Sequence, residues 1–336
     1  MELLRIVAIG GGTGLSTLLR GLKRYAKEPR ELEITAVVTV MDDGGSSGRL
    51  RREFDVLPPG DIRNCMVALS EDEALLSRLF QYRFAAGRGL KGHSFGNLFL
   101  TALTDLTGDF ALAVKVSSEI LTSAGRIYPS TAENVVLEAE LENGKSVKGE
   151  TRISESRARI RTIRLQPRVC KPLPEVLDAI AQADLITLGP GSLYTSVIPN
   201  LLVQDMPQAI RRSAAFKAYF VNLMWQPGET IGFRASDHLA AIERHAGMQL
   251  VDFAVVNTRQ ITPRQRRKYA AERSQPVEND IERLEKMGVQ VVGADLLAEG
   301  EIVRHDPDAA AAVAMQLARR SRGRRPMLRS NMRAGD

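Results

Sequence analysis

The sequence is poor in cysteine and has no long apolar run. Cys65 and Cys170 are the two cysteines among 336 residues, and their separation fits no metal-ligand spacing. A disulfide framework and a cysteine metal centre are therefore not expected. No apolar segment approaches the roughly 20 residues of a membrane span. Glu2 and Arg5 stand where a cleavable signal would need apolar residues. We expect reduced thiols and a cytoplasmic protein without a membrane span.

An excess of one charge is also missing from most of the chain. The net charge is +6, but residues 319–336 hold seven arginines and one acid, which is the whole excess. The neutral remainder excludes specific nucleic-acid binding through bulk charge. We predict one domain over residues 1–318 and a basic, disordered tail over 319–336, with weak contact to an anionic partner as the alternative.

Short apolar runs alternate with helical patterns along the body of the chain. The predicted strands are 4–9, 33–40, 184–188, 217–222, 251–256 and 289–292. The predicted helices are 15–27, 61–84, 95–122, 174–182, 205–213, 236–246, 263–273, 278–287 and 307–320. Near-continuous apolar strands between helices are typical of a mostly parallel, doubly wound α/β sheet with helices on both faces.

Residues 133–165 break this pattern, because their apolar side chains recur at every second position. Asn143-Gly144 stands between two such runs, and Asn-Gly is a strong signal for a hairpin turn. We therefore predict an antiparallel β insertion rather than a separate domain.

A glycine cluster follows the first strand, at Gly10-Gly11-Gly12-Thr13-Gly14. Its spacing fits neither the dinucleotide fingerprint nor a Walker loop. A glycine turn that opens a helix can still bind phosphate through backbone N–H groups and the helix dipole. An empty turn is the alternative.

A second turn of this type follows the strand at 184–188, and its predicted binding residues are Gly189, Pro190, Gly191, Ser192, Thr195 and Ser196. Ligands bind beyond the carboxyl ends of parallel strands. We therefore expect both turns to meet one ligand at the same edge of the sheet.

Two aspartates, Asp42 and Asp43, end the second strand and precede a loop of small residues, among them Gly44, Gly45, Ser46 and Ser47. Carboxylates there can bind magnesium or accept hydrogen bonds from hydroxyl groups, and the loop can donate to phosphate. The alternative is an Asp-Gly turn with a helix cap. Asp61, after Pro58-Pro59-Gly60, could join them or cap its own helix.

Further candidate ligand contacts lie on other loops. Asn64 follows Asp61, and His93 and Asn97 flank the start of a predicted helix. Arg304 could bind a diphosphate through its guanidinium group or form a surface ion pair.

Taken together, these motifs resemble the bacterial gluconeogenesis factor family (YvcK-like), within the CofD-like superfamily of 2-phospho-L-lactate transferases. The resemblance implies a Rossmann-like fold, a cytoplasmic location and binding of UDP-glucose or UDP-N-acetylglucosamine. It also implies a role in cell shape and cell-wall synthesis during growth on gluconeogenic carbon sources. In the transferase branch, aspartates that match Asp43 and Asp61 hold a metal. The residues after Asp43 match the gluconeogenesis factors instead.

Two hypotheses follow. In the first, the chain is a regulator that binds a UDP-sugar across both turns, with the sugar toward Asp42-Asp43 and residues 92–97. In the second, it is a magnesium-dependent enzyme similar to the 2-phospho-L-lactate transferases, which uses a nucleotide diphosphate donor and in which Asp43 and Asp61 are catalytic. Magnesium is the candidate cofactor, and no nicotinamide or flavin is expected. A cell-wall protein and a second copy of the chain are the candidate protein partners.

Overall fold

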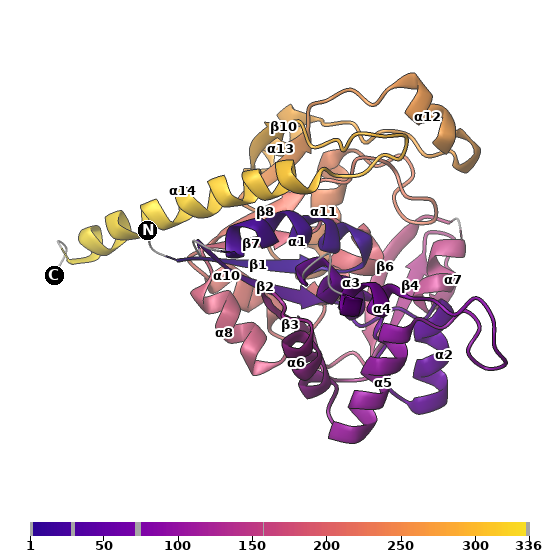
Figure 1. Ribbon diagram of the computed structural model, residues 1–336. Helices are drawn as coiled ribbons and strands as arrows, with labels where there is room; N and C mark the ends of the chain where they lie inside the picture. Colours follow the sequence, from indigo (N-terminus) through magenta and orange to yellow (C-terminus); the bar gives the residue numbers. More distant parts are fainter. Residues whose placement is uncertain (1–2, 28–30, 71–74, 157, 334–336) are drawn as a thin grey trace.

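A seven-stranded parallel sheet forms the centre of the molecule (Figure 1). The computed structural model describes residues 3–27, 31–70, 75–156 and 158–333. The strand order is β10-β9-β8-β7-β1-β2-β3, and every neighbouring pair is parallel. The strands are β1 Leu4–Gly10, β2 Leu32–Val38, β3 Arg126–Pro129, β7 Leu185–Leu188, β8 Phe216–Phe220, β9 Phe253–Asn257 and β10 Gln290–Ala294. The prediction of a doubly wound α/β fold is confirmed. Sequence analysis missed β3, a short edge strand.

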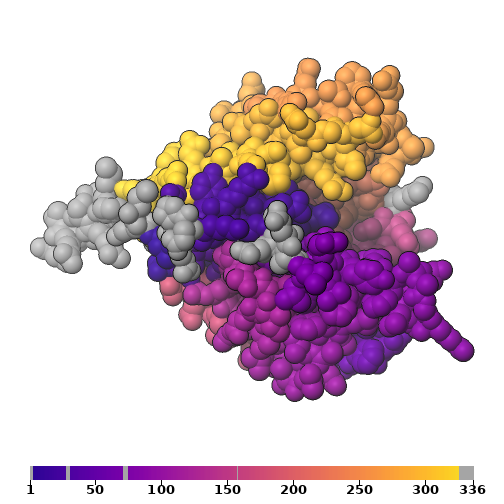
Figure 2. Space-filling model, in the orientation of Figure 1, coloured from indigo at the N-terminus to yellow at the C-terminus, as the bar shows by residue number. Residues whose placement is uncertain are grey.

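Helices cover both faces of this sheet. On one face α1 (Gly12–Ala26) packs against α3 (Gly60–Leu69) and α14 (Pro307–Arg333). Figure 2 shows α14 lying across α1. A Cβ added at Gly21 would lie 1.9 Å from the carbonyl oxygen of Pro307, so this crossing requires glycine. The other face carries α8 (Pro174–Gln182) and α10 (Met206–Arg212), below the strands in Figure 1.

Further helices extend these layers. They are α4 Leu75–Gln81, α5 Phe95–Thr107, α6 Phe110–Ile120, α9 Ile198–Leu201, α11 Ala235–Ala246, α12 Pro263–Tyr269 and α13 Ile281–Lys286. A π-helix, η1 (Leu193–Val197), precedes α9, and the 3₁₀ turn η2 (Ala270–Glu272) follows α12.

Two long predicted helices are each divided in the structure. The segment 95–122 breaks at Gly108, whose left-handed φ of 67° ends α5, and the Asp109 side chain then caps α6 by accepting from Leu112 N–H. The segment 61–84 contains α3 and α4, and residues 71–74 between them lie outside the described residues.

The predicted antiparallel insertion is confirmed as a three-stranded sheet of β4 (Val136–Leu141), β5 (Ser146–Lys148) and β6 (Ile160–Gln166), with β4 in the middle. Its first turn contains Asn143-Gly144, and Gly144 adopts a φ of 78°. Sequence analysis missed α7 (Glu150–Glu155), a short helix that joins β5 to β6. This helix becomes important for the site.

The end of the chain differs from the prediction of a disordered tail, because α14 continues to Arg333. Arg322 donates to both carboxylate oxygens of the buried Asp184, at 3.0 and 2.8 Å. Arg319 pairs with Glu31, and the Arg320 guanidinium lies 5.3 Å from the centre of the Phe253 ring. These contacts hold the first part of the predicted tail on the body, and residues 334–336 lie outside the described residues. Within the described residues, no helix has the length and apolarity that crossing a membrane requires.

Candidate functional site

The two glycine turns meet at the point where the strand order of the sheet reverses, between β1 and β7. β1 and β7 are neighbours in the sheet. The strand after β1, β2, lies toward one edge of the sheet, and the strand after β7, β8, lies toward the other edge. A crevice therefore forms beyond the carboxyl ends of β1 and β7. A Cβ added at Gly14 would lie 2.4 Å from the carbonyl oxygen of Pro190, and one at Gly191 would lie 3.4 Å from that of Gly11. The expected convergence of the turns is thus confirmed.

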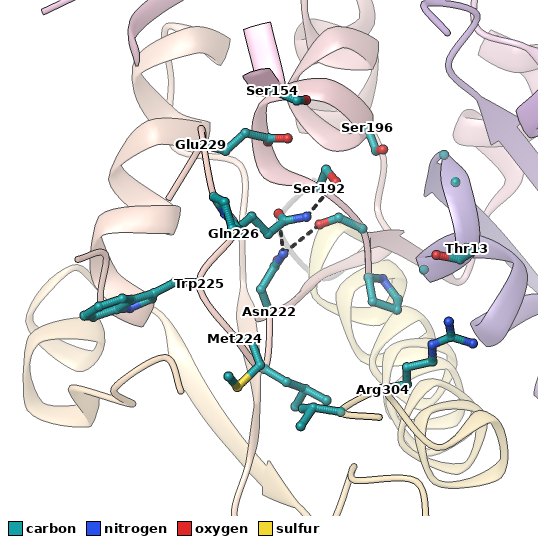
Figure 3. A pocket seen from close by; sticks show the side chains of 18 of the residues that line it. Thr13, Ser154, Ser192, Ser196, Asn222, Met224, Trp225, Gln226, Glu229 and Arg304 are labelled. Carbon is teal, nitrogen blue, oxygen red and sulfur yellow. Dashed lines mark hydrogen bonds between the residues drawn. The ribbon is translucent and has the colours of Figure 1, made fainter. Parts of the chain in front are cut away.

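A cavity of about 610 Å³ opens where the turns meet. Eleven of the residues predicted for ligand or metal binding line it: Gly11, Gly12, Thr13, Gly14, Asp42, Asp61, Pro190, Gly191, Ser192, Ser196 and Arg304. Lining residues that the sequence-based set lacked include Glu150, Ser154, Asn222, Gln226, Glu229 and His305. Figure 3 places Thr13 and Arg304 across the cavity from Gln226 and Glu229.

The first turn of α1 provides an anion site. α1 begins at Gly12 rather than at residue 15, so Gly12, Thr13 and Gly14 belong to the helix itself. Their N–H groups have no carbonyl acceptor within the helix. The backbone of Gly12 partly offsets the rise in the pKa of Asp61, whereas Thr13 and Gly14 line the cavity with the positive end of the helix dipole behind them.

The second turn does not offer an equivalent site, because a carboxylate already occupies it. Glu229 accepts from the backbone N–H of Tyr194 at 2.9 Å and from the Thr195 hydroxyl at 3.1 Å, at the start of η1. Thr195 is therefore committed to Glu229. Burial raises the pKa of Glu229 to about 7. A phosphate is consequently expected at α1 and not at η1.

Amide side chains fix the second turn in place. Asn222 donates to the carbonyl oxygen of Gly191 at 3.0 Å and to the side-chain oxygen of Gln226 at 2.9 Å (Figure 3). Gln226 in turn donates to the Ser192 hydroxyl at 2.7 Å. Both amides follow β8, so three neighbouring strands, β1, β7 and β8, build the cavity.

Carboxyl groups with raised pKa values surround the anion site. Burial, reinforced by the charge of Asp42, raises the pKa of Asp61 to about 7. Burial raises the pKa of Glu150 to about 9, with further contributions from the charges of Asp61 and Asp42. The negative charge of such a cluster disfavours a bound polyanion unless protons on the carboxyl groups or a bound cation neutralise it. Glu150 was missed because it is one acid among many in the insertion.

Positive charge in the cavity comes from Arg304, the one Lys or Arg among the described lining residues. Its neighbour His305 is neutral, because burial lowers its pKa to about 4. The Nε2 atom of His305 has no hydrogen-bond partner among the described residues.

Several predicted binding residues lie outside the cavity lining. The Ser46 hydroxyl and His93 Nδ1 are 3.0 Å apart, Asn97 donates to the Ser47 hydroxyl at 3.3 Å, and Asn64 accepts from Arg63 at 2.6 Å. The predicted loop 44–48 is the start of a helix, α2 (Gly45–Phe54), with Gly44 as its N-cap. Ser46 and Ser47 are buried because α2 packs against α5. Gly10 and Gly189 support the turns from behind, where their backbones approach each other.

Asp43 also faces away from the cavity. Its Oδ1 atom accepts from the Thr151 N–H at 2.9 Å and from the Thr151 hydroxyl at 2.7 Å. Its neighbour Asp42 lines the cavity and accepts from Gly44 N–H at 2.9 Å. The two neighbouring aspartates therefore have different surroundings.

Asp42 and Asp61 line the cavity, where they fit a magnesium ion shared with a ligand, whereas Asp43 lies outside the lining. Across the described ranges, no group of three or more His, Cys, Asp or Glu side chains is placed to hold a metal. Magnesium at nucleotide sites is usually bound by one or two carboxylates together with phosphate oxygens. The two aspartates in the cavity suit that arrangement.

Comparisons with known proteins agree with this architecture. The profile of the CofD family, described as 2-phospho-L-lactate transferase CofD, matches residues 6–297. The gluconeogenesis factor of Bacillus subtilis is 46% identical over 314 residues, covering 93% of this chain and 98% of that protein. The gluconeogenesis factor of Halalkalibacterium halodurans is 48% identical over 307 residues, covering 91% and 94%. The crystal structure of a Bacillus halodurans protein superposes with a TM-score of 0.90 at 46% identity, covering 94% of this chain and all of that one.

Proposed function

The chain belongs to the CofD family and, within it, to the gluconeogenesis factors, and from this premise we propose that it binds a UDP-sugar as a cytoplasmic regulator of cell shape. UDP-N-acetylglucosamine and UDP-glucose are the proposed ligands. Occupancy of the cavity would report the supply of cell-wall precursors to a protein partner.

The first turn of α1 carries this proposal. Thr13 and Gly14 present N–H groups at a positive helix end, and Arg304 adds a cation on the same side of the cavity. A diphosphate can accept hydrogen bonds from both kinds of donor. The volume of about 610 Å³ suits a ligand of nucleotide-sugar size.

Magnesium would neutralise the charge between the diphosphate and the carboxylates of Asp42 and Asp61. Without it, the ionised Asp61 carboxylate, whose pKa is raised to about 7, repels a second anion nearby whenever it is charged. We therefore expect binding to be stronger with magnesium, and stronger at pH 6 than at pH 8 when magnesium is absent, because Asp61 gains a proton across that range.

Titration calorimetry with UDP-N-acetylglucosamine, with and without magnesium, tests the proposal. We expect saturable binding in magnesium, and an Arg304→Ala variant that binds roughly tenfold more weakly. Arg20→Ala, an exposed arginine on α1 away from the cavity, is the charge-matched control and should bind like the parent. No heat at millimolar ligand, with or without magnesium, would refute the proposal.

A transferase is the second candidate, favoured by the CofD match and by the acids of the cavity. Chromatography of the same samples distinguishes the two. Recovery of intact sugar nucleotide supports binding, and its magnesium-dependent cleavage, with water as the acceptor in these samples, supports group transfer.

A further inference from the structure

Asp43 connects the main sheet to the β insertion. It follows β2, and its Oδ1 atom accepts two hydrogen bonds from Thr151, the second residue of α7. Its Oδ2 atom lies only 2.2 Å from where a Cβ at Gly149 would stand, and Gly149 has a φ of 93°. The carboxylate therefore fits closely against the first turn of α7 and caps it from another part of the chain.

The opposite side of α7 is held by the loop after β8. A Cβ added at Gly228 would lie 2.1 Å from the carbonyl oxygen of Ser154. Arg51 of α2 makes a second link to the insertion, donating to the carbonyl oxygen of Val135 at 2.6 Å. The short helix thus lies between two loops of the main sheet, and neither contact belongs to the insertion's own hydrogen-bonded strands.

This helix brings two side chains to the cavity. Glu150 and Ser154, one turn apart on α7, are both among its lining residues. A helix of six residues is too short to be stable alone, so its position depends on the contacts around it.

We propose that Asp43 is a positioning residue that holds α7, and through it Glu150 and Ser154, as one wall of the ligand cavity. It therefore does not act as a metal ligand in this chain. Its Oδ1 atom already accepts from two donors of Thr151, its Oδ2 atom lies against the first turn of α7 at Gly149, and the side chain is absent from the cavity lining. The effect of α7 on affinity rests on the proposed function, whereas the effect of Asp43 on α7 does not.

Two substitutions at Asp43 separate positioning from metal binding. The Asp43→Asn variant retains a side-chain oxygen that can accept from Thr151 but loses the charge that a magnesium ligand needs. Asp43→Ala loses both. Thr151→Val keeps the backbone donor, removes the hydroxyl donor and preserves side-chain shape. Hydrogen exchange of residues 149–156 reports on α7 without any ligand, and calorimetry reports on UDP-N-acetylglucosamine.

We expect the α7 amides of Asp43→Asn to be as well protected from hydrogen exchange as those of the parent chain. Its nucleotide binding should depend on magnesium as the parent's does. In Asp43→Ala, the α7 amides should exchange faster and the affinity for UDP-N-acetylglucosamine should fall roughly tenfold. Thr151→Val should lie between the two Asp43 variants in both measurements. Equal loss of protection in the two Asp43 variants would overturn the proposal, as would unchanged exchange in all three. Loss of the magnesium effect in Asp43→Asn, with α7 still protected, would identify Asp43 as a metal ligand. If no variant or parent binds the nucleotide, the exchange result still decides the role of Asp43.

Discussion

Gly14→Ala is expected to lose UDP-sugar binding and to unfold more easily than the parent chain. The added methyl group would lie 2.4 Å from the carbonyl oxygen of Pro190 and 2.7 Å from the Cα atom of Gly191. Both are backbone atoms, so relief requires one glycine turn to move away from the other. We expect a loss of about 2 kcal/mol in the free energy of unfolding and a fall in affinity of at least roughly a hundredfold.

The sign of this effect is informative, because alanine normally stabilises a helix relative to glycine by up to about 1 kcal/mol. Gly323→Ala is the matched control: Gly323 lies in α14, and no atom stands within 4 Å of its added Cβ. The control should be neutral or slightly stabilised and should bind normally. Urea unfolding and calorimetry measure both quantities. A Gly14→Ala chain that gains stability like the control would show that the two turns are not in close contact.

Glu150→Gln is expected to stabilise the protein at pH 8 and to have little effect near pH 4.5. The folded-state pKa of Glu150 is about 9, well above the ordinary glutamate value of 4.5, because burial and neighbouring acids disfavour its charge. Between these two values the folded chain retains a proton that the unfolded chain has released. Stability therefore falls as pH rises through this window. Glutamine resembles the protonated carboxyl group and avoids that cost.

We expect the free energy of unfolding of Glu150→Gln to exceed that of the parent by about 2 kcal/mol at pH 8. This is less than the full pKa shift of Glu150 would give, because its side chain is only half-buried. Urea unfolding at pH 4.5, 6 and 8 measures it. Glu155→Gln, at the exposed end of the same helix, serves as the control and should show no such trend. A difference between Glu150→Gln and the parent that stays constant with pH would contradict the assigned environment. A carboxyl group retained at such a cost is typical of a functional site.

The residues at strand ends could be located from the sequence because parallel topology constrains them. Once Gly10–Gly14 and Gly189–Ser196 were placed after neighbouring strands, their convergence followed from the shared direction of those strands. The hairpin at Asn143-Gly144 was equally local, since its turn residues carry their own backbone preference.

Other features depended on packing that no local pattern encodes. The sequence could not decide which of Asp42 and Asp43 faces the cavity, because a shift of one residue exchanges them. Glu229 comes from the loop after β8, yet it occupies the helix end that was expected to bind phosphate. Glu150 reaches the cavity only because the insertion folds back against the main sheet, a contact between segments far apart in the chain.

A crystal structure of the chain soaked with UDP-N-acetylglucosamine and magnesium tests the central claim most directly. The account predicts the diphosphate at the first turn of α1, within hydrogen-bonding distance of the Thr13 and Gly14 N–H groups and in contact with the Arg304 guanidinium. A diphosphate bound at η1, or anywhere outside the crevice between β1 and β7, would contradict it.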